Sequence, residues 1–85
     1  MTGAEMKAIR HGLSEAIGRR LSLADMAKLC GLAPKNGADT MRKWEEGDGP
    51  SGPVAALLSL YASALDSDWD AVSFMLKTIR ERLDA

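Results

Sequence analysis

The chain has 85 residues, enough for one small domain, because a chain of this size buries only about 60–65% of the surface that it exposes when unfolded. Apolar residues make up 46% and charged residues 27%, a globular balance that excludes wholesale disorder. The formal net charge of −1 argues against a uniformly basic protein that coats nucleic acid.

The apolar pattern predicts an all-α chain, because no segment alternates apolar and polar residues over the length of a strand. A first helix begins near Gly3, since Thr2 and Glu5 form a capping-box pattern. Apolar residues then follow at spacings of three and four: Met6, Ile9, Leu13 and Ile17. Gly12 and Gly18 each cost about 1 kcal/mol relative to Ala inside a helix, so this helix ends near residue 11 or bends before residue 19.

A short second helix is expected next. Ser22 is a good N-cap, and Asp25, at the third helical position, favours the positive end of a helix. Gly31 ends this helix at about Cys30.

A turn and a third helix follow. Pro34 and an Asn-Gly pair make residues 32–37 a turn. We expect Asn36 to cap the third helix, with Asp39 three residues further on, and the helix to run to about Glu46. Its inward face consists of two apolar residues, Met41 and Trp44.

Two longer helices complete the chain after the loop GDGPSGP at residues 47–53. Pro53 suits the first turn of a fourth helix over about 53–65, whose apolar stripe is Val54, Leu57, Leu58, Tyr61 and Leu65. Ser67 and Asp70 repeat the cap pattern at the start of a fifth helix over about 68–83. Its apolar stripe is Trp69, Val72, Leu76, Ile79 and Leu83.

The second and third helices have the features of a helix-turn-helix over about residues 22–46. Ala27 is small, as a steep helix crossing requires, and Gly31 suits the turn. The outer face of the third helix carries Asp39, Arg42 and Lys43, which leaves it polar for the major groove of DNA. The second and third helices can pack onto the other helices through apolar residues. These residues are Met26, Cys30, Leu32, Met41 and Trp44.

The segments SLADMAKLCGL, TMRKWEEG and SGPVAALLSLY together resemble the Xre-like, lambda-repressor-like family of helix-turn-helix proteins, over roughly residues 2–65. The resemblance implies a compact five-helix domain, a single unit over residues 1–85, that binds double-stranded DNA. It further implies a homodimeric transcriptional regulator on a palindromic operator, in the bacterial cytoplasm. Autoregulation of a small phage, prophage, toxin–antitoxin or anti-CRISPR operon is implied in the same way.

The chain departs from the family pattern by about four extra residues between Gly31 and Trp44. Either the turn is enlarged, or the third helix gains an N-terminal turn that starts near Pro34. Counted back from Trp44, four positions match the base-contacting ones of the family: Ala38, Asp39, Arg42 and Lys43.

These residue types suit base recognition. Arg42 or Lys43 can donate to guanine, Asp39 can accept from cytosine, and Ala38 can contact a thymine methyl group. The candidates for phosphate contacts flank the starts of the two short helices: Arg19, Arg20, Ser22, Lys35, Asn36 and Thr40.

Two roles are open for the fifth helix, because four helices already enclose a core. Its stripe of Trp69, Val72, Leu76 and Ile79 either completes the monomer or forms a dimer interface. A single small domain makes few phosphate contacts, so useful affinity favours a dimer that reads two half-sites.

The charge distribution leaves a second class of function open. Residues 1–46 hold eight Lys and Arg against six Asp and Glu, a net charge of +2, whereas residues 47–85 hold three against six, a net charge of −3. The basic half can approach phosphates and the acidic half can face away. The alternative is a protein-binding adaptor that uses the same helical fold and an acidic surface.

Composition also limits chemistry. With Cys30 and His11 as the single members of their types, we expect no disulfide within the chain, no metal site and no cofactor. We expect neither an enzyme nor a small-molecule ligand, since GxSxG, HExxH and Walker-type motifs are absent. Its apolar runs are far below the roughly 20 residues that span a bilayer, so we expect a cytoplasmic protein without membrane contact.

Overall fold

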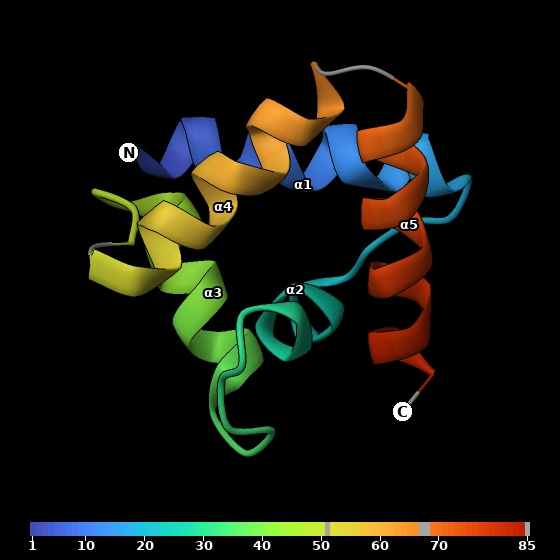
Figure 1. Cartoon of the computed structure of the whole chain (residues 1–85). Helices are drawn as coiled ribbons and strands as arrows, with labels where there is room; N and C mark the ends of the chain where they lie inside the picture. The colour runs from blue at the N-terminus through green and yellow to red at the C-terminus, as the bar shows by residue number, and fades with distance from the viewer. Residues whose placement is uncertain (51, 67–68, 85) are drawn as a thin grey trace.

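Five α-helices and no strand make up the parts of the chain that the computed structural model describes (Figure 1). These parts are residues 1–50, 52–66 and 69–84, with the side chains of 69–71 excluded. The helices are α1 (Gly3–Ile17), α2 (Leu23–Leu29), α3 (Gly37–Glu46), α4 (Gly52–Leu65) and α5 (Trp69–Leu83). The predicted all-α fold class is therefore confirmed. The predicted cap of Ser67 and Asp70 and the side chain of Trp69 lie outside the described residues.

The capping boxes of α1 and α2 confirm the predicted starts of both helices. In α1 the Thr2 hydroxyl accepts a hydrogen bond from the Glu5 amide at 3.1 Å, and the Glu5 carboxylate accepts one from the Thr2 amide at 3.2 Å. Ser22 and Asp25 form the same reciprocal pair in α2, with both distances 3.1 Å. Each box satisfies two N–H groups that a helix start would otherwise leave unpaired.

Of the two alternatives for α1, an end near residue 11 is wrong, because the helix runs through Gly12 to Ile17. It ends where Gly18 adopts the left-handed conformation, with φ 71°, and donates to the carbonyl of Glu15. Gly12 has a packing role instead: a Cβ atom there would lie 3.3 Å from Cδ1 of Leu65, so glycine lets α4 lie close to α1.

The segment before α3 settles the choice between an enlarged turn and a longer helix. α3 begins at Gly37, so the extra residues lie in the turn, and the Gly37 amide donates to the carbonyl of Ala33 at 2.9 Å. The prediction that the Asn36 side chain caps α3 is wrong: Asn36 stands at the N-cap position but makes no side-chain cap bond. Its ψ of 3° departs from the extended values of 165° and 170° at the two capping residues Thr2 and Ser22.

The core draws side chains from all five helices. α4 crosses over α1, and α5 stands beside α2 and α4. α2 and α3 lie together below α1 and α4 in the view of Figure 1. The buried apolar residues are Met6, Leu13, Ile17, Leu21, Met26, Ala27, Leu29, Met41, Leu58, Met75 and Ile79. Within the described ranges, no helix is long and apolar enough to cross a membrane.

α5 completes this core. Ile79 is 1% exposed and Met75 is 8% exposed, so both side chains are buried within the monomer. Polar contacts fasten the same helix to its neighbours: Lys28 of α2 donates to the carbonyl of Leu83 at 2.9 Å, and Arg80 donates to the carbonyl of Ile17 at 3.3 Å. Of the two roles left open for α5, Ile79 therefore serves the first, which is to complete the core of the monomer.

Two glycines of α1 provide a test of this packing. A Cβ atom on Gly3 would lie 2.6 Å from the carbonyl oxygens of Glu45 and Gly47, which belong to the backbone and have no room to move. We expect Gly3→Ala to lower the free energy of unfolding by about 1–3 kcal/mol. In Gly12→Ala the crowded atom is the flexible end of Leu65, and the gain in helix propensity, about 1 kcal/mol, offsets the strain.

Urea denaturation followed by circular dichroism checks both values. Equal effects of the two substitutions would contradict the tight approach of α1 to the end of α3.

Candidate nucleic-acid interface

α2 and α3 make the most extensive contact between any two helices of the described chain. A Cβ atom on Gly37 would lie 2.7 Å from the Cβ of Ala27, so the helices cross where both residues are small. From the sequence we predicted that Ala27 lies at this helix crossing, but we did not predict that Gly37 is its partner there. The turn between them begins at Gly31, with φ 75°, and the Leu32 amide donates to the carbonyl of Ala27 at 2.9 Å.

The outer face of α3 is polar, and its inner face is fixed. Asp39, Arg42 and Lys43 are all exposed, as is Glu46 one turn later. Met41, on the opposite side of the helix, is fully buried. The three charged residues that the sequence assigned to base contacts therefore share one solvent-facing surface.

Ion pairs within α3 neutralise this surface. Arg42 donates a hydrogen bond to Asp39, and Nζ of Lys43 lies 3.5 Å from the other carboxylate oxygen of Asp39. The hydrogen bond from Arg42 lowers the pKa of Asp39, and the charges of Arg42 and Lys43 act in the same direction. With two basic and two acidic side chains, counting Glu46, the outer face of α3 has no net charge.

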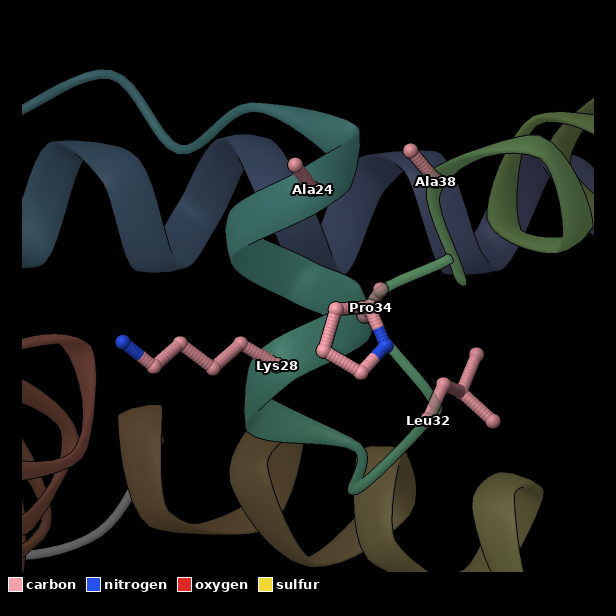
Figure 2. Close-up of a pocket in the computed structure, with 6 residues that line it drawn as sticks. Ala24, Lys28, Leu32, Pro34 and Ala38 are labelled. Atoms are coloured by element: carbon pink, nitrogen blue, oxygen red, sulfur yellow. The ribbon is translucent and has the colours of Figure 1, made fainter. Parts of the chain in front are cut away.

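Ala38 lies at the edge of this polar surface, one turn before Arg42. It is half-buried and lines an apolar groove of about 270 Å³ between α2 and α3, together with Ala24, Leu32 and Pro34 (Figure 2). In that view Ala24 and Ala38 lie at one end of the groove, while the Lys28 side chain extends away from it, in keeping with its bond to Leu83. Of the four predicted base-contacting residues, Ala38 alone lies on this groove.

α1 and the start of α2 lie beside the outer face of α3. A shallow hollow of about 300 Å³ is lined by Lys7 and Arg10 of α1, Leu23 of α2, and Arg42 of α3 with its neighbours Glu45 and Glu46. A second hollow of about 560 Å³ shares Lys7 and Arg10 and continues along α1, past His11, to Arg20. The structure thus brings Arg20 and Arg42 to one side of the molecule with Lys7, which the sequence did not single out.

The remaining candidates for phosphate contacts occupy two places. Ser22 is exposed at the N-cap of α2, and Arg19 lies close by, with its guanidinium 3.5 Å from Asp25. Lys35 and Asn36 are exposed in the turn ahead of α3 and line neither hollow. Thr40 lies in α3 and is half-buried.

An ion pair that the sequence did not predict fixes α3 to α1. Nε and Nη2 of Arg10 donate to the two carboxylate oxygens of Glu45 at 2.8 and 2.9 Å, and Nη1 donates to the carbonyl of Leu21 at 3.1 Å. The side chains are 12% and 8% exposed. The hydrogen bond with Glu45 raises the pKa of Arg10, so the guanidinium stays charged. One side chain therefore joins α1, the segment before α2, and α3.

Cys30 is a packing residue in this structure. It is half-buried against the core, and burial raises the pKa of its thiol to about 11. At neutral pH the thiol is protonated, whereas the thiolate is the reactive form. Among the described side chains, no three His, Cys, Asp or Glu residues come together as a metal site would require.

No family model, curated protein or solved structure matches this chain.

The buried ion pair can be tested by its effect on stability. Glu45→Ala leaves the charge of Arg10 without a partner, so we expect the free energy of unfolding to fall by about 3–5 kcal/mol. Lys43→Ala, in the same helix, removes an exposed pair and changes it by less than about 0.5 kcal/mol. Thermal or urea unfolding measures both, and similar losses in the two variants would contradict the role given to Arg10 and Glu45.

Proposed function

We propose that this protein is a sequence-specific regulator of transcription that binds double-stranded DNA, with α2 and α3 as a helix-turn-helix and α3 as the helix that enters the major groove. One observation carries the proposal: α3 presents exposed polar side chains while its inner face is locked. Met41 anchors that inner face in the core, and Glu45 ties it to α1. A helix held in this way offers a pre-organised set of hydrogen-bonding groups, which lowers the entropic cost of binding.

The groups on that face suit the edges of base pairs. Arg42 and Lys43 can donate to guanine O6 and N7, and Asp39 can accept from the amino group of cytosine. The contact between Asp39 and Arg42 orders the guanidinium before DNA arrives. Ala38, in the first turn of α3, offers the small apolar surface that a thymine methyl group contacts.

Because the face of α3 has no net charge, phosphate contacts must come from its surroundings. We propose that they come from the predicted set of Arg19, Arg20, Ser22, Lys35, Asn36 and Thr40, and that Lys7 of α1 joins them. Few such contacts predict weak binding to random DNA, so tight binding needs base contacts and two half-sites.

These considerations favour a homodimer on a palindromic operator. We propose that it works in the cytoplasm as a repressor that occludes a promoter, such as the promoter of its own small operon.

A protein-binding adaptor is the competing function, and the neutral outer face of α3 is the observation in its favour. Filter binding of random genomic fragments at two salt concentrations separates the two. A DNA-binding protein retains fragments at low salt and releases them steeply as salt rises, because each phosphate contact releases counterions. No retained fragment at low salt would favour the adaptor.

Arg42→Ala tests the assignment of α3. On a site selected from a random DNA pool, we expect binding to weaken by about 1–3 kcal/mol and the preference at one base position to relax. Arg82→Ala is the matched control, because Arg82 is an exposed arginine at the end of α5. Fluorescence anisotropy on the selected site and its single-base variants measures both effects, and unchanged binding by Arg42→Ala would show that α3 does not read this site.

A further inference from the structure

Asp39 is an exposed carboxylate in the first turn of α3, and it contacts both cations of the outer face at once. Arg42 donates to Oδ1 of Asp39, and Nζ of Lys43 lies 3.5 Å from Oδ2. The hydrogen bond from Arg42 lowers the pKa of the carboxyl, so Asp39 is charged at neutral pH. A single acidic side chain thus engages the two basic side chains that could approach DNA from this face.

A carboxylate on a surface that meets DNA has an electrostatic cost. Double-stranded DNA carries one negative charge per about 1.7 Å of its axis, and a protein gains affinity when its cations displace counterions from the phosphates. The major-groove edges of guanine and thymine present acceptors, to which an ionised carboxylate, itself only an acceptor, cannot bond. Most sequences therefore meet Asp39 as a repulsive group, with Arg42 and Lys43 already in contact with it.

Cytosine is the base that offsets this cost most fully. Its amino group is a donor in the major groove, whereas adenine has an acceptor, N7, beside its amino group. A carboxylate has about four lone-pair sites, so Asp39 can accept from cytosine and keep its contact with Arg42. Arg42 follows Asp39 by three residues, about 4.5 Å along the helix axis, which is close to the spacing of about 3.4 Å between base pairs. The two side chains can therefore bond a cytosine and a guanine at neighbouring base pairs.

We propose that Asp39 determines specificity by exclusion: it weakens the binding of α3 to DNA that lacks a cytosine opposite it, because it engages Arg42 and Lys43 and repels acceptors. This role of Asp39 rests on the proposed function, since it acts on DNA. It explains why a face with two exposed basic residues has no net charge. Removal of the carboxylate is then expected to strengthen binding to random DNA, whereas removal of a group that only attracts DNA would weaken it.

Asp39→Asn tests the proposal on two duplexes, one with the site that the unaltered chain selects from a random pool and one of random sequence. The amide keeps the size of the side chain, removes its charge and leaves Arg42 and Lys43 free to contact phosphates. On the random duplex we expect the dissociation constant to fall at least about threefold and its salt dependence to steepen by about one phosphate contact. The ratio of the dissociation constants for the random and the selected duplex should fall at least about tenfold.

The base preference of the same variant provides a second readout. Asparagine can bond both N6 and N7 of adenine, so a new selection with Asp39→Asn should replace one cytosine of the site with adenine.

Glu46→Gln is the matched control, because it makes the same change of charge at an exposed position of α3, about two turns further along. It should strengthen binding to both duplexes by a similar factor and select the same sequence as the unaltered chain. Asp39 and Glu46 are both exposed, so circular dichroism should show that both variants are folded.

Three results would overturn the role given to Asp39. The first is an Asp39→Asn variant that binds random DNA no more tightly than Glu46→Gln does. The second is an unchanged ratio between the two duplexes, and the third is a selected site in which no cytosine changes. In each case the unaltered chain still binds its selected site, so the proposed function stands. If neither the unaltered chain nor Asp39→Asn bound any duplex at low salt, the proposed function itself would fail.

Discussion

The ion pair between Arg10 and Glu45 is the constraint on which the rest of this structure depends. A guanidinium has five donors in a fixed plane, and here three of its N–H groups are used, two by the Glu45 carboxylate and one by the carbonyl of Leu21. The pair therefore sets the rotation of α3 about its axis as well as its distance from α1. Burying two charges yields little net stability, so the main effect of such a pair is to select one arrangement of helices over others.

Close backbone contacts add to this constraint. Because Gly3 has no side chain, the end of α3 can pack against the start of α1. In the same way, Gly37 lets α3 pack closely against Ala27 of α2. With one side of α3 fixed by backbone contacts and a buried ion pair, the other side has a defined orientation. That orientation turns Asp39, Arg42 and Lys43 outward together, and it is the physical basis for the proposal that α3 reads DNA.

Much of the fold could be predicted from local signals, because capping boxes and apolar spacings are short-range. Thr2 and Ser22 marked two helix starts in this way, and Ala27 marked the helix crossing. Long-range pairs left no such signal: Arg10 and Glu45 are 35 positions apart. A clue did exist, since each follows a buried methionine by four residues, Met6 and Met41, which places a charge at an apolar position of a helix. The missing Asn36 cap depended on a backbone angle that composition does not encode.

The most direct measurement is a titration of the ¹⁵N-labelled chain with a DNA duplex that carries the site selected from a random pool, at low salt, followed by amide chemical shifts. We expect the largest shifts in α3, from Ala38 to Lys43, with further shifts at Ser22 and Lys35 and little change in α4 and α5. The shifts should diminish as salt is added, because each phosphate contact made on binding releases counterions. An absence of shifts, or shifts confined to α4 and α5, would contradict the claim that the outer face of α3 binds DNA.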